Sequence, residues 1–295
     1  MLAGVAGEPV VVETFRQASE VLGEDLAAII RDDAERLNRT EYTQPALLAS
    51  GVALWRLWRD RGGRMPQLMA GHSLGEYTAL TCAGVLDTAD AVRLVRRRGE
   101  LMQSAVAEGE GAMAAILGLE DDQVLRACEQ AAEGDVVEAV NFNAPGQVVV
   151  AGQVAAVERA IALCREAGAR RATTLPVSVP SHCALMREAA GQLAKELESM
   201  DFQAPEIPVI NNVDVRAETD PAAIRDALVR QLHSPVRWVE TVRALSEQGV
   251  DTAVECGPGK VLAGLIRRIE RGMKVLPLGT AEALEAALQE VGTNE

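Results

Sequence analysis

Helices alternate with short apolar runs along most of the chain. Helical periodicity covers residues 9–22, 26–37, 43–58, 76–83, 87–102, 181–200, 221–231, 235–247, 261–271 and 281–291. Apolar runs typical of buried strands cover residues 67–70, 207–211, 250–255 and 275–278. Strands that alternate with helices usually pair in parallel and are covered by the helices on both faces. The pattern therefore predicts an α/β domain built around a parallel sheet.

The starts of two of these helices are predicted from particular residues. Thr43-Gln44-Pro45 is predicted to begin the long third helix, because proline is tolerated in the first turn. Ser181 is predicted to begin the helix over 181–200, which would place His182 at a helix start.

The middle of the chain has a different pattern. β-rich runs cover 111–117, 136–141, 147–151 and 171–175, and helical stretches cover 120–132 and 154–167. A turn signal, Asn143-Ala144-Pro145-Gly146, separates the second and third runs. The order β-α-β-β-α-β is that of the ferredoxin-like unit. We therefore expect a small inserted domain over 108–177, with residues 1–107 and 178–295 forming the large domain.

The segment Gly71-His72-Ser73-Leu74-Gly75 has the features of a nucleophile elbow. It follows a predicted strand and precedes a predicted helix, and the serine lies between two glycines, as in the G-x-S-x-G pattern. The helix that follows would direct its free N–H groups and positive dipole end at the serine oxygen. Ser73 is therefore the candidate nucleophile of a hydrolase-like domain. The alternative is a glycine-flanked turn in which Ser73 only caps the helix.

A serine nucleophile needs a base, and the chain has three histidines. His72 is adjacent to Ser73 on a sharp turn, where it is expected to pack under the elbow. His233 lies in a polar loop. His182 lies where the chain re-enters the large domain, and by elimination it is the candidate base. Of the acidic residues between Ser73 and His182, Asp87 and Asp90 read as helix caps and Asp135 as a turn residue. A backbone carbonyl is therefore the alternative partner that would orient the imidazole.

Composition narrows the classes of function. The net charge of −14 argues against a general nucleic-acid or acidic-membrane binder, because the field of the protein would repel polyanions. Five cysteines without a C-x-x-C pair exclude a disulfide framework or zinc knuckle and suit a reducing cytosol. No apolar run approaches the ~20 residues that span a bilayer, and no signal peptide is recognised near the N-terminus. We expect a cytoplasmic protein without nucleic-acid or membrane partners.

Several motifs together carry a family resemblance. They are Gly71-His72-Ser73-Leu74-Gly75-Glu76-Tyr77, Arg98-Gly99, Asn141-Phe142-Asn143-Ala144-Pro145-Gly146-Gln147, Val179-Pro180-Ser181-His182, Ser234-Pro235-Val236-Arg237-Trp238 and Glu255-Cys256-Gly257-Pro258-Gly259-Lys260. The chain resembles the malonyl-CoA:acyl-carrier-protein transacylases of bacterial type II fatty acid synthesis over nearly its whole length.

The resemblance implies a ping-pong transfer of malonyl from malonyl-CoA to the phosphopantetheine thiol of acyl carrier protein. Ser73 would form a malonyl ester, with His182 as base and the main-chain carbonyl of Gln231 orienting the histidine. Arg98 would form a bidentate pair with the malonyl carboxylate; on the residues alone it reads as one more solvated arginine. The further substrate-binding residues implied are Leu74, through its N–H, Met102, which reads equally as core, and Asn141. We expect no cofactor, no metal and a monomer.

One part of the family pattern is missing. The family begins with a strand and a Gly-Gln-Gly-Ser-Gln loop that supplies half of the oxyanion hole, and this chain starts just after that point. We expect a truncated chain or a start codon assigned too far downstream. Two other functions stay open: a serine esterase or thioesterase, and an impaired relative that acts as a binding protein. Arg64, Lys260, Arg267 and Arg268 are candidates for a basic surface that docks the acidic carrier protein.

Overall fold

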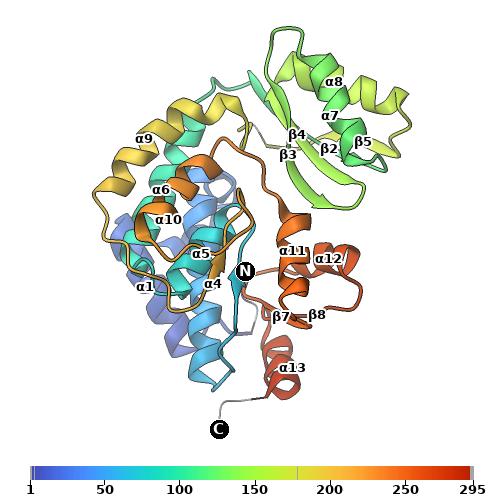
Figure 1. The fold of residues 1–295 in the computed structure, drawn as a ribbon. Coiled ribbons are helices and arrows are strands. Elements are labelled where there is room, and N and C mark those ends of the chain that lie inside the picture. Colours follow the sequence, from blue (N-terminus) through green and yellow to red (C-terminus); the bar gives the residue numbers. More distant parts are fainter. Residues whose placement is uncertain (1, 3, 178, 293–295) are drawn as a thin grey trace.

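The computed structural model describes residues 2, 4–177 and 179–292, and it is an α/β structure with a large and a small part (Figure 1). The helices of the large part are α1 (Pro9–Leu22), α2 (Leu26–Asp32), α3 (Ala34–Leu37), α4 (Thr40–Asp60), α5 (Leu74–Cys82), α6 (Thr88–Ser104), the 3-10 helix η1 (Ala184–Met186), α9 (Arg187–Glu198), α10 (Pro221–Gln231), α11 (Trp238–Glu247), α12 (Val261–Ile269) and α13 (Ala281–Val291). Most of them lie within a residue or two of the predicted bounds.

The strands of the large part are parallel, as predicted. Strand β1 (Met69–Ala70) pairs with β6 (Val209–Ile210), and β7 (Thr252–Glu255) pairs with β8 (Lys274–Pro277). Within the described residues they form two separate two-stranded sheets instead of one continuous sheet. The elbow leaves the carboxyl end of β1, where loops of parallel sheets commonly build sites.

The small part consists of β2 (Gly111–Leu117), α7 (Asp121–Ala132), β3 (Val137–Ala144), β4 (Gln147–Gln153), α8 (Val154–Glu166) and β5 (Arg171–Thr174). Its strands form an antiparallel sheet in the order β3-β4-β2-β5. The two helices pack on one face of this sheet through an apolar core. The predicted βαββαβ order is confirmed, and so is the α/β fold class with an inserted ferredoxin-like unit.

The start of α4 was predicted wrongly, because the helix begins at Thr40 and contains Pro45 in its second turn. A proline there cannot donate to the carbonyl four residues earlier, which belongs to Glu41. Arg96 of α6 donates to this carbonyl from Nη1 at 3.4 Å. A neighbouring helix therefore satisfies the group that the proline leaves free. The predicted helix over 26–37 also divides, at Asp33, whose side chain caps α3.

Two further predicted helices begin later than the sequence indicated. Instead of a helix from Ser181, regular helix starts only at Arg187, after η1, because His182 has a left-handed backbone (φ 65°) and Cys183 is extended. Helix α11 starts at Trp238, because Val236 is held by β3: its N–H donates to the carbonyl of Val140 at 2.8 Å. Both departures accompany contacts with distant segments, since the N–H of His182 donates to the carbonyl of Leu232 at 3.1 Å, and a local sequence pattern does not contain such contacts.

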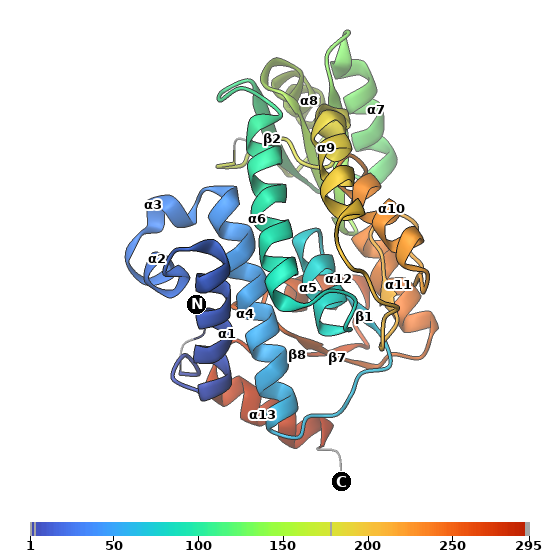
Figure 2. The same cartoon turned by 90° about the vertical axis from the view of Figure 1, so that its left-hand side faces the viewer.

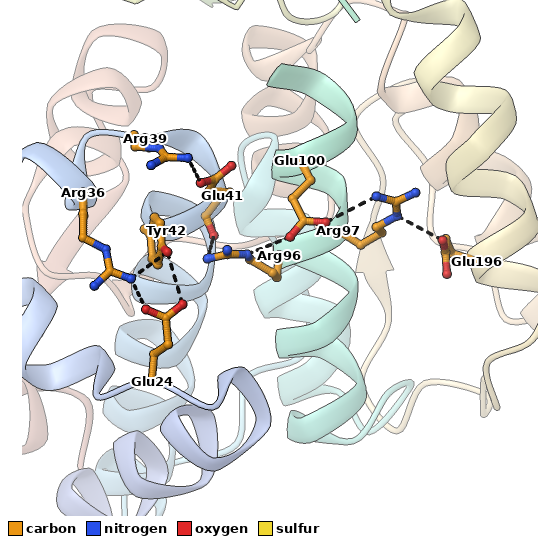
Figure 3. Close-up of polar contacts among 9 residues, drawn as sticks. All are labelled: Glu24, Arg36, Arg39, Glu41, Tyr42, Arg96, Arg97, Glu100 and Glu196. Atoms are coloured by element: carbon orange, nitrogen blue, oxygen red, sulfur yellow. Dashed lines mark hydrogen bonds and ion pairs between the residues drawn. The ribbon is translucent and has the colours of Figure 1, made fainter. Parts of the chain in front are cut away.

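Helices α4 and α6 lie side by side (Figure 2). At Gly99 of α6, an added Cβ would lie 2.6 Å from Cα of Glu41, so only glycine permits this approach. A charged network surrounds the contact (Figure 3), and its members are Glu24, Arg36, Arg39, Glu41, Tyr42, Arg96, Arg97, Glu100 and Glu196. The network links α4, α6 and α9, and it fixes the first turns of α4 against α6.

Candidate active site

Ser73 lies at a strained turn between β1 and α5. Its φ of 52° and ψ of −109° are far from the usual regions for a residue with a side chain. At Gly71 a Cβ would lie 1.9 Å from the carbonyl carbon of Gly75, so the turn requires glycine there. At Gly75 an added Cβ meets nothing within 4 Å, so crowding does not explain the second glycine. Leu74 begins α5, and an N–H at this position has no acceptor within its own helix.

His182, which follows the inserted part in the sequence, contacts Ser73. The Ser73 hydroxyl and His182 Nε2 are 2.8 Å apart, and His182 Nδ1 is 2.7 Å from the main-chain oxygen of Gln231. Because a carbonyl only accepts, Nδ1 carries the proton and Nε2 accepts from the Ser73 hydroxyl. Burial, then the positive charge of Arg98, lowers the pKa of His182 to about 3. The imidazole is therefore neutral at pH 7 and available as a base.

Arg98 is buried, with 1% of its surface exposed, so it is not one more solvated arginine. Its Nη2 lies 3.3 Å from Ser73 Oγ and 3.2 Å from Gln231 Oε1, and its Nη1 donates to Gln44 Oε1 at 2.7 Å. Burial lowers the pKa of Arg98, while Tyr77 and Glu76 raise it. The site therefore holds a planar cationic fork beside the serine hydroxyl.

The side chain of Asn212, which was not predicted as a site residue, hydrogen-bonds the backbone of the elbow. Its Oδ1 accepts from the Ser73 N–H at 2.7 Å, and its Nδ2 donates to the Gly71 carbonyl at 2.7 Å. It is fully buried and follows β6, the strand that pairs with β1. A polar residue directly after a buried strand was the signal that could have identified it.

Glu76 and the side chain of Gln231 were also missed. Glu76 is 2% exposed, and its Oε2 accepts from Gln231 Nε2 and from the Asn212 N–H, both at 2.9 Å. Gln231 Nε2 also donates to the Ser73 carbonyl at 3.1 Å. Burial raises the pKa of Glu76 to about 7. Gln44 had no signal at all, because its contact with Arg98 depends on how α4 packs on α6.

The remaining predicted residues lie around this centre. Met102 is buried, and its sulfur lies 3.4 Å from Gln44 Nε2, so it contacts a residue that holds Arg98. Asn141 is half-buried on β3, and its buried Oδ1 has no hydrogen-bond partner among the described residues. His72 packs edge-on against Trp238 and hydrogen-bonds Asn143 at 2.7 Å. The structure thus brings Ser73, His182, Arg98 and the Gln231 carbonyl into direct contact.

The part of the chain that the structure describes holds neither a metal-binding cluster nor a membrane-spanning helix. No group of three or more His, Cys, Asp and Glu side chains there could hold a metal ion. In the same ranges no helix combines the length and apolarity needed to cross a membrane.

Comparison with known proteins gives consistent matches. Residues 7–286 match the acyl transferase domain family. The chain is 59% identical over 290 residues to "Malonyl CoA-acyl carrier protein transacylase" of Salmonella typhimurium, covering 98% of this chain and 94% of the relative. The Escherichia coli K12 protein of the same name is 58% identical over 291 residues, again covering 98% and 94%.

Solved structures match equally well. An acyl carrier protein S-malonyltransferase from Vibrio cholerae is 59% identical, with a TM-score of 0.95 over 97% of this chain and 94% of that one. A malonyl-transacylase solved in complex with the acyl-carrier protein of a type II polyketide synthase is 54% identical, with a TM-score of 0.95 over 97% and 93%.

Proposed function

The chain belongs to the acyl transferase family, among the malonyl-CoA:acyl-carrier-protein transacylases, and from this premise we propose how its residues carry out the transfer. It is an [acyl-carrier-protein] S-malonyltransferase, and it moves malonyl from malonyl-CoA to the thiol of acyl carrier protein in fatty acid synthesis.

Ser73 is the nucleophile and His182 the base. As Ser73 Oγ attacks the thioester carbonyl of malonyl-CoA, its proton passes to His182 Nε2, and collapse of the tetrahedral intermediate breaks the C–S bond. The coenzyme A thiolate leaves with the proton from His182. The carrier thiol then gives its proton to His182 and attacks the malonyl-serine ester, and Ser73 regains a proton as the ester C–O bond breaks. The 2.8 Å contact between the two side chains supports these roles.

The N–H of Leu74 is proposed to donate to the oxyanion. Leu74 is the first residue of α5, so the positive end of the helix dipole and an amide without an acceptor in its own helix both lie beside Ser73. One such donor typically contributes about 10²–10³ in rate, because it is fixed before the charge develops.

Arg98 is proposed to bind the malonyl carboxylate, and its position is the observation that carries the substrate assignment. A malonyl carboxylate is separated from the thioester carbonyl by one CH₂ group, so its partner must lie within a few ångströms of the nucleophile. Arg98 Nη2 is 3.3 Å from Ser73 Oγ. A guanidinium fork pairs with a carboxylate through two parallel hydrogen bonds, which a neutral acyl group cannot form. This supports a malonyl transferase over an esterase of neutral esters.

Mass spectrometry after incubation with malonyl-CoA tests the proposal. We expect one malonyl adduct on Ser73 that disappears when acyl carrier protein with its phosphopantetheine arm is added, and no adduct with Ser73→Ala. Rapid loss of the adduct to water without a carrier would indicate a thioesterase. Absence of any adduct on the wild-type protein would instead favour a binding protein.

The carrier surface is proposed to include Arg267 and Arg268, which are exposed on α12. Arg268 also reaches the small part, where its Nη1 donates to Gln147 Oε1 at 2.5 Å. Arg64 fits this surface poorly: it follows the far end of α4, and at ~1.5 Å per residue Asp60 lies about 24 Å from Gln44. Arg268→Glu should raise KM for the carrier without slowing acylation of Ser73.

Three other expectations stay proposals. They are the division into residues 1–107 with 178–295 and 108–177, a monomeric state, and a cytoplasmic location without a bound cofactor. The separate apolar core of the small part supports the division.

A further inference from the structure

Gln231 is the common partner of the groups that the proposed function uses. Its main-chain oxygen accepts from His182 Nδ1, and its side-chain oxygen accepts from Arg98 Nη2. Its side-chain nitrogen donates to the main-chain oxygen of Ser73. The side chain is fully buried, so its amide has no solvent alternative. The direction of this amide decides whether Arg98 faces an oxygen or an NH₂ group.

Glu76 fixes the direction of the amide. An ionised carboxylate only accepts hydrogen bonds, so the NH₂ group of Gln231 must face Glu76 Oε2, 2.9 Å away. The amide oxygen then faces Arg98, which only donates. If the amide were reversed, NH₂ would face the guanidinium and an oxygen would face a carboxylate, and both contacts would be lost. The same Oε2 accepts from the N–H of Asn212, the residue that holds the elbow.

We propose that Glu76 is a positioning residue for malonyl selection: its buried negative charge orients the Gln231 amide and balances the Arg98 guanidinium, so that a charged fork is held beside Ser73. The inference rests on the proposed function of Ser73 and Arg98 and adds what controls the acyl preference. A buried carboxylate costs free energy of folding unless hydrogen bonds and an opposite charge compensate it. Here that charge faces a buried cation across a single glutamine.

The alternative hypothesis is that Glu76 only fills space in α5. The variant Glu76→Gln distinguishes this hypothesis from a role of the charge. Both donors to Glu76 point at one oxygen, so a glutamine can place its amide oxygen there and keep both bonds. Shape and hydrogen bonds are retained, and only the charge is lost. The matched control is Glu196→Gln: Glu196 is half-exposed on α9 and pairs with Arg97 at 3.1 Å, beside Arg98 in the sequence.

The measurement is the rate of Ser73 acylation by malonyl-CoA and by acetyl-CoA, as kcat/KM for each. For Glu76→Gln we expect the malonyl-to-acetyl ratio to fall about tenfold, mainly through KM for malonyl-CoA. Glu196→Gln should leave the ratio unchanged. An unchanged ratio in Glu76→Gln would overturn the inference. If the wild-type protein forms no malonyl adduct, the proposed function fails instead, so the two failures are distinguishable.

The pH profile gives an independent readout. Among the described residues, the charged and titratable groups near Glu76 include Arg98 on α6, Tyr77 on α5, and Asp214 and Glu218 on the segment after β6. With the pKa of Glu76 raised to about 7, its charge is lost as the pH falls below that value. Malonyl kcat/KM should therefore fall on the acidic side of pH 7 in the wild type, and this limb should be absent in Glu76→Gln. An identical limb in both proteins would contradict the assignment.

If Glu76→Gln does not fold, as judged by its melting transition, Glu76→Asp decides the question. Aspartate keeps the charge but is one methylene shorter, so its contact with Gln231 lengthens, while the charge still favours an NH₂ group that faces it and an amide oxygen that faces Arg98. We expect slower acylation by both substrates with the malonyl preference kept within about threefold. Loss of the preference in Glu76→Asp would show that charge is not what sets it.

Discussion

The small part and the elbow region bury very different chemistry. Among the described residues, the buried side chains of the small part are apolar or cysteine, and the polar backbone groups pair along the strands. Around the elbow, by contrast, the buried side chains are polar or charged, and each is at most 2% exposed: Glu76, Arg98, His182, Asn212 and Gln231. Buried polar groups add little net stability when paired and cost much when unpaired. Burial in the first region stabilises the fold. Burial in the second contributes little net stability but fixes the positions of donors and acceptors around Ser73.

Replacing His182 should have the largest effect on activity. In His182→Ala, Ser73 keeps its turn but loses the group that takes its proton, so we expect malonyl transfer to fall by about 10³–10⁴. The measurement is single-turnover acylation by malonyl-CoA. A fall of less than tenfold would mean that another group acts as the base.

Arg98→Ala should have the next largest effect, and it should depend on the acyl group. Loss of the fork removes a charge-assisted pair with the malonyl carboxylate, so we expect malonyl kcat/KM to fall about 100-fold and acetyl kcat/KM far less. Arg98→Lys should not restore malonyl transfer, because an ammonium lacks the planar fork. Equal losses for both acyl groups would refute the carboxylate role.

Ile116→Ala tests the other region. Ile116 is 1% exposed in the core of the small part, so truncation leaves a cavity that should cost about 2–3 kcal/mol of the free energy of unfolding. Because Ile116 belongs to an apolar cluster that, among the described residues, includes no member of the elbow region, kcat/KM per folded molecule should change less than about twofold. Chemical denaturation with active-site titration measures both quantities. A large change in kcat/KM would show that the two regions are coupled.

The same contrast explains how far the sequence could be interpreted. In the small part, each predicted element lies within a few residues of its place, because alternation and helical periodicity report local burial. Ser73 was identified because a glycine-flanked turn has a local signature. The helix predicted from Ser181 and the start of α4 at Thr43 were wrong. His182 has a left-handed backbone among distant contacts, and the carbonyl that Pro45 leaves free accepts from Arg96 of another helix.

Function-bearing contacts between segments were the least predictable. From its neighbours in the sequence, Arg98 was interpreted as a solvated arginine, and only the family resemblance gave it a role. Gln44 lies 54 residues from Arg98, and Glu76 lies 155 from Gln231, so no local pattern joins either pair. Such contacts depend on packing of helices from different segments.

The smallest expected effect concerns stability, and it separates a functional buried charge from a structural one. The pKa of Glu76 is raised from 4.5 to about 7 by burial, so the folded protein binds this proton more tightly than the unfolded chain. The stabilisation from that proton is present below pH 4.5 and is lost as the pH rises through about 7. Glu76→Gln has no such loss. Its free energy of unfolding should therefore exceed that of the wild type by about 1–2 kcal/mol at pH 8, less than the roughly 3 kcal/mol that the full shift corresponds to, and by little near pH 5. Urea denaturation at the two pH values measures the difference. A variant that is more stable yet less selective for malonyl would show that the charge is kept for the site, whereas a loss of stability at pH 8 would show that Glu76 holds the fold.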